Sequence, residues 1–391
     1  MPKLTEMLSI IWKFPKTNIY ECMILHYLFL KLNGYACFTI VGSIESGKIR
    51  TSIFDWLLFP AYLALALGLW VANVWLGDFS SAFSPLMIIG NRMLWFMCYF
   101  CAVFGLFWNF LNRHKVWSLY TSVYHVDQQL LALGANMYYT RTYLSMIGFS
   151  LTGMLILLAY FIEKVLNQKY TLVTMFAFTY PNASLMMLVT IFSIAGSLVC
   201  IRLSALNQII SSNCVPSGDG KIIKVAEQFS IPTIQQYMQI YDQVCDITET
   251  VNLCYSGQIM IAIAGSFIYL LFYAFGTVVF IRRGISIADF PLEDLMWTFI
   301  YSLNIIFIVS VGGALKSQAQ RTSSLIDQAI NATKNTDAAE MLRLFLMQMG
   351  HRTPTLTCGL FPFDWSLVYS IVATSTTYLI ILIQFENSRS G

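Results

Sequence analysis

Charged residues are scarce in this 391-residue chain, where Asp, Glu, Lys and Arg together make up only 11%. A soluble domain normally carries about 25% of them, which excludes a fold built around one water-excluded core. The net charge of +3 is small and dispersed, so nucleic acid is not an expected partner. What is abundant is apolar: 57% of residues are hydrophobic, in long runs separated by polar loops. The sequence therefore predicts an all-α, polytopic membrane protein.

Patterns that carry enzyme chemistry are also lacking. No Ser/His/Asp arrangement or G-x-S-x-G is visible, and the four histidines show no ligand spacing. Gly42–Lys48 is close to a phosphate loop, but Ile49 stands where Ser or Thr should hold magnesium. Cys98 and Cys101 form a C-x-x-C inside an apolar helix, without a second pair or a His partner. We therefore expect no enzyme activity, no metal site and no cofactor.

Ionisable residues are nearly missing from the apolar runs. Proton-driven carriers and pumps usually place carboxylates or histidines at mid-membrane, so this scarcity argues against them. It leaves open a channel whose pore is lined by neutral polar groups. The nine cysteines lie mostly in apolar runs or in segments expected in the cytosol, so we predict free thiols and no disulfide framework.

Seven runs are long and apolar enough to be predicted as membrane-spanning helices. They are Trp56–Leu76, Met93–Phe110, Tyr143–Ile162, Ser184–Ile201, Gly257–Ile281, Trp297–Leu315 and Ser366–Phe385. Glu21–Ile44 contains Lys31 and Asn33, which are costly in lipid, so we interpret it as an amphipathic or interfacial segment. With the N-terminus in the cytosol, seventeen of the 23 Lys and Arg residues fall on the inner side. This favours a cytosolic N-terminus and an outer C-terminus.

Three polar segments assigned to the cytosol carry apolar residues at helical spacing: Asn112–Gly134, Leu203–Ser256 and Gly313–Gly350. Such helices need a packing partner, which predicts an intracellular helical platform shared between subunits. The expected organisation has four parts. These are a cytosolic or interfacial segment (1–55), six spans with cytosolic extensions (56–315), an intracellular anchor helix and linker (316–365), and the seventh span with a short outer tail (366–391).

The last span carries polar groups along an otherwise apolar helix, with no charge between Asp364 and Glu386. Thr377, Ile381 and Gln384 share one face, because they are spaced by four and three residues. Hydroxyl and amide groups in such a span must find partners other than lipid. The hydroxyls could bond back to helix carbonyls or to a neighbouring helix, or the stripe could face water in a pore.

The C-terminal sequence also contains two specific motifs. Thr377 and Tyr378, five apolar residues, then Gln384 and Phe385 spell T-Y-x5-Q-F. Before it comes the pattern C-G-x-F-x-x-D, whose fixed positions are Cys358, Gly359, Phe361 and Asp364. This pair of motifs resembles the C-terminal motifs of the insect gustatory receptor family, relatives of the insect odorant receptors. Upstream of these motifs only the layout of spans matches.

The resemblance implies a channel of four subunits, either homomeric or mixed with other receptor subunits, with the seventh helix of each lining one pore. Gln384 and Phe385 would form the gate at the extracellular end, with Thr377 and Ile381 below them. Tyr378 would pack against the adjacent helix. Four amides without a fixed carboxylate suit a non-selective pore for monovalent and divalent cations.

The resemblance also implies that a small-molecule tastant enters from outside, into a pocket among the outer halves of the spans. Aromatic residues with a few hydrogen-bonding groups suit a sugar or a bitter compound equally well. The candidates by depth are Arg92, Trp95, Tyr99, Tyr160, Glu163, Tyr269, Tyr273, Trp297, Tyr301 and Asn304. The alternative is that the Trp and Tyr residues form an ordinary interfacial belt. Asn182 opens an N-glycosylation sequon on the predicted outer side, close to the membrane.

The resulting hypothesis is a taste receptor of the plasma membrane, embedded in the bilayer, that acts as a ligand-gated cation channel. A G-protein-coupled receptor is the alternative from another class, because seven spans also fit it. The loop charges place its N-terminus on the wrong side, and neither an Asp/Glu-Arg-Tyr nor an N-P-x-x-Y motif is present. A small-molecule transporter is the third possibility.

Overall fold

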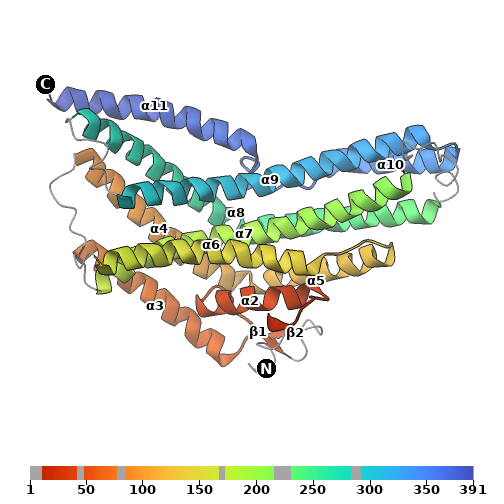
Figure 1. Cartoon of the computed structure of the whole chain (residues 1–391), viewed down its shortest axis with the longest axis horizontal. Coiled ribbons are helices and arrows are strands. Elements are labelled where there is room, and N and C mark those ends of the chain that lie inside the picture. Colours follow the sequence, from red (N-terminus) through yellow and green to blue (C-terminus); the bar gives the residue numbers. More distant parts are fainter. Residues whose placement is uncertain are drawn as a thin grey trace.

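The computed structural model describes residues 11–41, 48–76, 85–166, 172–214, 230–282 and 292–390. These residues form a mostly helical molecule, with one small pair of strands near the N-terminus (Figure 1). The remaining elements are α2 (Ile19–Leu32), α3 (Ile53–Leu76), α4 (Pro85–Leu111), α5 (Arg113–Ala132), α6 (Tyr139–Leu166), α7 (Leu172–Cys214), α8 (Ile231–Arg282), α9 (Leu292–Ala332), α10 (Thr336–His351) and α11 (Trp365–Ser390).

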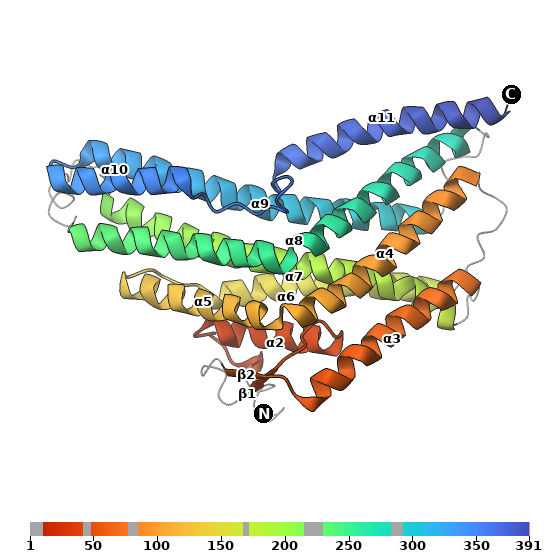
Figure 2. The same ribbon diagram turned by 180° about the vertical axis from the view of Figure 1, so that it is seen from behind.

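Helices α7 and α9 and the first part of α8 run along the long axis of the molecule (Figures 1 and 2). The longest, α8, has 52 residues. At 1.5 Å per residue this is about 78 Å, more than twice the thickness of a bilayer core. At one end, here called the compact end, α5 and α10 lie beside them (Figures 1 and 2). At the other, the open end, α3, α4, α11 and the last part of α8 splay outward.

The predicted spans and the predicted polar helices therefore belong to the same continuous helices. One helix, α8, joins the predicted span Gly257–Ile281 to the polar run before it, and α9 carries the span Trp297–Leu315 on to Ala332. Within the predicted polar segment Leu203–Ser256, the Gly-, Pro- and Ser-containing stretch Val215–Gly220 lies outside the described residues. Helix α9 also continues without interruption through residue 316, where the sequence analysis placed a boundary.

Six helices in the described part are long and apolar enough to cross a membrane, by length and composition alone: α3, α4, α7, α8, α9 and α11. They contain six of the seven predicted spans. The predicted third span, Tyr143–Ile162, lies within α6, a 28-residue helix in which several side chains fall outside the description. The helical nature of this span agrees with the prediction.

The N-terminal segment, expected to be amphipathic or interfacial and not a full span, contains a short helix that packs on the bundle. Helix α2 has only 14 residues, too short for a bilayer core, and buries nine side chains against the bundle, chiefly at α5 and α6. After it come two strands that the sequence analysis did not predict, β1 (Thr39–Val41) and β2 (Lys48–Arg50), paired antiparallel. Lys31 is an ion-pair partner of Asp55 at the start of α3, which satisfies the charge that made a lipid-embedded helix costly.

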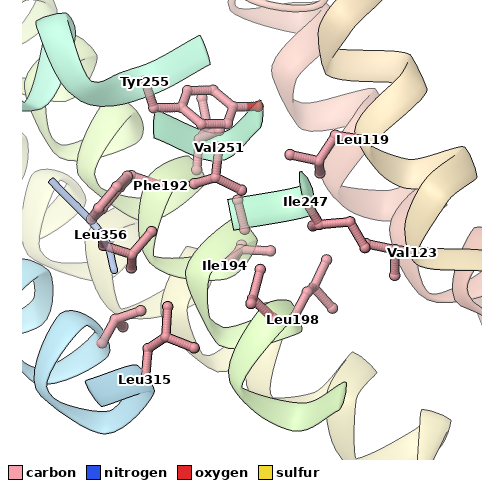
Figure 3. Packing of buried hydrophobic residues seen from close by; sticks show 14 of the residues in the cluster. Leu119, Val123, Phe192, Ile194, Leu198, Ile247, Val251, Tyr255, Leu315 and Leu356 are labelled. Atoms are coloured by element: carbon pink, nitrogen blue, oxygen red, sulfur yellow. The ribbon is translucent and has the colours of Figure 1, made fainter. Parts of the chain in front are cut away.

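The core lies where α5, α7, α8 and α9 meet (Figure 3). Leu119 and Val123 of α5 face Ile247 of α8, and Ile194 and Leu198 of α7 lie beside them. One ion pair is fully buried beside this core. Arg202 of α7 donates to both carboxylate oxygens of Asp127 of α5, at 2.8 and 2.7 Å, and Tyr139 of α6 donates to the same carboxylate at 3.1 Å.

Candidate functional sites

The C-G-x-F-x-x-D motif forms a tight turn immediately before α11. Gly359 takes a positive φ of 83°, which suits glycine because it has no Cβ. The backbone N–H of Gly359 donates to Thr357 Oγ1, and Thr357 Oγ1 donates to the Phe361 carbonyl, each at 2.9 Å. Cys358 is half-buried, and its N–H also donates to the Phe361 carbonyl. The motif therefore closes on itself through its own hydrogen bonds.

Three helices hold this turn in place. Asn252 of α8 donates to the carbonyl of Thr355 at 2.8 Å and accepts from the N–H of Thr357 at 3.0 Å. Phe363 is fully buried, with its ring edge-on to Phe192 of α7 at 5.4 Å. On α9, a Cβ at Gly312 would meet the Phe363 carbonyl, so only glycine fits there.

Asp364 connects the turn to α11. Its carboxylate accepts from Lys316 of α9 at 2.7 Å and from the N–H of Ser366 at 3.0 Å, in the first turn of α11. The hydrogen bond from Lys316, followed by that from Ser366, lowers the pKa of Asp364 below its ordinary value. A carboxylate at a helix N-terminus is also favoured by the helix dipole.

Beyond this turn, α11 makes few contacts within the chain. It lies along one edge of the molecule, beside α8 and α9 (Figure 2). Tyr378 contacts the ring edge of Phe267 on α8 at 6.5 Å, and Arg282 at the end of α8 donates to Asn387. In the most apolar 18-residue stretch of Trp365–Ser388, no residue is buried within the chain. In the corresponding stretch of α7, 72% of the residues are buried. In a single protomer, the other helices of the chain therefore leave most of α11 uncovered.

The four residues predicted for the pore are all exposed on α11: Thr377, Ile381, Gln384 and Phe385. Phe385 is 61% exposed. The hydroxyl groups follow the local alternative considered for them. Thr377 donates to the Ala373 carbonyl at 3.2 Å, and Ser370 donates to the Ser366 carbonyl at 3.1 Å. The hydroxyls therefore do not require water, and the polar character of the stripe rests on the exposed amide of Gln384.

A second group of predicted residues meets around Tyr301 of α9 at the open end. The Tyr301 hydroxyl donates to Asn182 Oδ1 of α7 at 2.6 Å and lies 3.3 Å from the sulfur of Cys98 of α4. Its ring stacks on Tyr269 of α8 at 4.4 Å, and Trp297 lies one helical turn away at 6.2 Å. Four helices thus meet at one aromatic cluster, which we call the Tyr301 cluster.

The remaining pocket candidates are distributed around this cluster. Tyr273 stacks on Tyr269 at 6.1 Å, and Asn304 is buried one turn below Tyr301. Tyr99 is buried and donates to the carbonyls of Ala177 and Leu69, at 2.5 and 3.1 Å. The other four are less informative: Arg92 is exposed, Trp95 is half-buried, and the side chains of Tyr160 and Glu163 lie outside the described residues.

Two residues of the Tyr301 cluster were predicted to have other roles. Asn182 was predicted as a glycosylation acceptor, but it is 3% exposed inside α7 and engaged by Tyr301. A glycan on its amide has no room in this arrangement, so the structure disfavours that prediction. Cys98, which was considered above as part of a C-x-x-C pattern, lies against the Tyr301 hydroxyl. In the described part of the chain, no three His, Cys, Asp or Glu side chains are placed to hold a metal ion.

The fold defines a multi-pass helical membrane protein, and its longest helix exceeds the thickness of a bilayer core. Residues 24–388 match the 7tm chemosensory receptor family, and the chain belongs to that family. The family predicted from the C-terminal motifs is thus confirmed, and the chain is a chemoreceptor of the insect receptor family.

Individual relatives agree with this assignment. The chain is 24% identical to "Putative gustatory receptor 28b" of Drosophila melanogaster, over 95% of this chain and 87% of the relative. It is 30% identical to "Putative gustatory receptor 28a" of the same species, over 39% of this chain and 35% of the relative.

Solved structures show the same fold at low sequence identity. The insect olfactory receptor OR5 from Machilis hrabei, solved alone and in complex with eugenol, gives TM-scores of 0.66 and 0.61 at 12% identity. Each comparison covers 92% of this chain and 96% of the receptor chain.

Proposed function

We propose that this protein is a taste receptor that acts as a ligand-gated cation channel, with four copies of α11 around one pore. The seven-span topology then has a cytosolic N-terminus and an outer C-terminus, with the compact end in the cytosol. The observation that carries the proposal is the exposure of α11. A helix whose most apolar stretch has no residue buried in its own chain needs a cover from outside that chain, either lipid or other subunits.

The exposed side chains of α11 are of two kinds: large apolar or aromatic groups, which suit lipid or a neighbouring subunit, and the amide of Gln384, which suits water. Tyr369, Val372 and Ile380 are large, apolar or aromatic and exposed, as lipid or a neighbouring subunit requires. Gln384 is exposed and polar, and an amide in hydrocarbon without a partner costs several kcal/mol. Around a fourfold axis, Gln384 instead meets water, ions and its own copies.

The tastant site is proposed at the Tyr301 cluster, between helices that open toward the outer side. Stacked rings provide apolar faces, and the Asn182 amide and Tyr301 hydroxyl provide hydrogen bonds, as a sugar or an alkaloid needs. In the present arrangement Tyr301 is 2% exposed and already bonded. A ligand must therefore displace these rings, and their movement supplies the signal.

The path from this cluster to α11 runs along α8. Tyr269 stacks on Tyr301, and Phe267, two residues earlier on the same helix, meets Tyr378 of α11. At the far end, Arg282 of α8 is bonded to Asn387. A shift of the outer half of α8 is therefore passed to α11 at two points. The turn at residues 355–364, fixed by α7, α8 and α9, serves as the pivot.

The deciding experiment is expression of the full chain in cells without chemoreceptors, with patch recording against a panel of sugars and bitter compounds. A ligand-evoked cation current that persists when G-protein signalling is blocked with GDPβS supports the channel. A response abolished by GDPβS, or ligand uptake without current, overturns it. A terminal epitope tag detected on the C-terminus of intact cells tests the proposed orientation in the same cells.

A further inference from the structure

Basic side chains adjoin exposed aromatic rings where α3 and α5 begin. The guanidinium group of Arg113, at the start of α5, lies over the ring of Phe110 at 4.6 Å and over that of Trp56 at 5.9 Å. The two rings also meet each other edge to face at 5.4 Å. Arg113 Nη1 donates to the Phe110 carbonyl at 2.8 Å, which fixes the guanidinium, and the side chain stays partly exposed. One arginine thus joins α3, the end of α4 and the start of α5.

Two further basic residues lie close to this point. Arg50 of β2 is paired in register with Thr39 of β1, and Thr39 Oγ1 donates to Asp55 at 2.9 Å, next to Trp56. The side chain of Arg50 is exposed, and so is that of Lys115 in the first turn of α5. Together with Phe110 and Arg113, these residues form what we call the Arg113 surface. It consists of Arg50, Trp56, Phe110, Arg113 and Lys115.

The positive charges of the Arg113 surface are not neutralised by the neighbouring sequence. Residues 48–57 and 107–121 contain one acidic residue, Asp55. Its side chain is 1% exposed and is already engaged by Lys31 and by the Thr39 hydroxyl. Within the described part of the chain, none of the three basic side chains of this surface forms an ion pair. The surface therefore carries a net positive charge that an anion from outside the chain can match.

The adjoining surface of α3 and α4 is apolar and covered by lipid. Its large side chains are between 49% and 78% exposed: Ile53, Phe54, Trp56, Leu57, Phe107 and Leu111. The stretches apolar enough to span a membrane begin at Ile53 in α3 and end at Leu111 in α4. Arg50 precedes the first stretch by three residues and Arg113 follows the second by two. The basic residues thus lie at the depth where lipid chains give way to headgroups.

The chemistry of the surface selects the kind of headgroup. Arginine binds phosphate through parallel N–H donors, and each basic residue near an anionic membrane surface adds attraction. A choline headgroup carries its own positive charge, which three basic side chains disfavour. An indole ring such as that of Trp56 prefers the interface between lipid chains and water. Phosphate, negative charge and acyl chains are therefore all required of the partner.

We propose that the Arg113 surface binds an anionic phospholipid of the cytosolic leaflet. Arg50, Arg113 and Lys115 hold the phosphate and its charged headgroup, and the acyl chains lie along the exposed side chains of α3 and α4. Binding fastens the pair of strands β1 and β2 to the membrane surface. The choice of leaflet rests on the proposed cytosolic N-terminus, whereas the lipid contact itself requires neither the proposed pore nor a tastant.

The test uses the full-length receptor in detergent, titrated with photoreactive dioctanoyl phosphatidylserine and mapped by mass spectrometry. We expect labelling of residues 48–57 and 107–121 to reach half-saturation at a concentration about tenfold lower than with the matching phosphatidylcholine. Arg50→Gln and Lys115→Gln change exposed side chains, so folding is preserved. Each raises the half-saturation concentration about fivefold. The matched control Arg343→Gln, at an exposed position on α10, leaves it unchanged.

A competition experiment separates a lipid surface from a site for free phosphate compounds. Glycerophosphoserine has the headgroup without acyl chains and should compete at least about tenfold less well than the lipid, because apolar contacts are lost. Equal competition overturns the proposal. So do equal half-saturation by phosphatidylserine and phosphatidylcholine, and unchanged binding in the double variant Arg50→Gln with Lys115→Gln. An N-terminal tag detected on intact cells overturns the leaflet assignment together with the proposed topology, and the titration in detergent is unaffected by that result.

Discussion

The backbone oxygen of Phe363 occupies the position that a Cβ on Gly312 would take. The turn before α11 thus crosses α9 in direct backbone contact. Gly312→Ala must push the turn away, and we expect it to cost about 1–3 kcal/mol of stability, as overpacking does. Thermal unfolding of the detergent-solubilised receptor measures this. Gly68→Ala on α3, where no atom lies within 4 Å, is the matched control. Equal melting temperatures for the two variants would show that the turn is not seated on α9.

The ion pair between Asp364 and Lys316 predicts a specific pH dependence. Because hydrogen bonds lower the pKa of Asp364, its contribution is complete above the ordinary value of 3.8 and is lost as pH falls through the lowered pKa. The Lys316 side chain is 55% exposed, so solvent screening keeps the pair below about 1 kcal/mol. Lys316→Met should therefore lower the melting temperature slightly and by the same amount at pH 5, 6, 7 and 8. A difference that changes across this range would contradict the assignment.

Asp364 itself should matter more than its cation, because it also caps α11. Its carboxylate accepts from the N–H of Ser366, and loss of such a cap costs about 1 kcal/mol. Asp364→Asn keeps an acceptor and should retain most of the stability, whereas Asp364→Ala should not. The same melting experiment distinguishes these two variants.

The pair of Arg202 and Asp127 is the most buried charge interaction of the described chain, with side-chain exposures of 1% and 0%. Removing one partner leaves an uncompensated buried charge, which costs about 3–5 kcal/mol. Arg202→Met and Asp127→Asn should each strongly reduce the yield of folded receptor, and Arg202→Met with Asp127→Leu should recover part of it. Fluorescence-detected size exclusion measures the recovery. If the double variant is worse than both single variants, polar contacts such as that of Tyr139 carry the stability instead.

Local patterns in the sequence predicted the helices well, because apolar periodicity and span length are local properties. The family was predicted from two short motifs, and Asp364 and Gly359 of those motifs have visible roles at the turn. The pairing of Arg202 with Asp127 was not predicted, since residues 75 positions apart carry no mutual signal in one sequence. The strands β1 and β2 were not predicted either, because three residues each are too few to show an alternating pattern.

The functional sites were only partly accessible to sequence reasoning. Depth in the membrane selected Tyr269, Trp297 and Tyr301, which do meet in the structure. The predicted depth of a residue in the membrane does not indicate which way its side chain points. Exposed Arg92 was therefore selected together with buried Tyr99. The burial of Asn182 could not be predicted, because a sequon is recognised by three letters, whatever the burial of its amide.

Tyr301 provides a test of the proposed tastant site. Tyr301→Phe removes the hydroxyl that donates to Asn182 and leaves the stacked ring in place. We expect the ligand concentration for half-maximal current to rise about tenfold, since a buried hydrogen bond to the ligand or its partner is lost. Phe299→Leu, on the exposed face of the same helix, is the control. An unchanged dose–response curve in Tyr301→Phe would place the tastant elsewhere.

Gln384 offers the most direct test of the pore. If four copies of α11 surround the axis, Gln384→Ala removes four amides that replace part of the hydration shell of a passing ion. We expect relative permeability of calcium to sodium to change by at least about twofold, with surface expression intact, because the side chain is exposed and its loss leaves no cavity. Leu382→Ala, half-buried on the opposite side of α11, controls for a general effect of shortening a side chain. Reversal potentials measured with each ion outside provide the comparison. Identical permeation in Gln384→Ala and the unmodified receptor would mean that α11 faces lipid at this position, and the pore would have to lie along another helix.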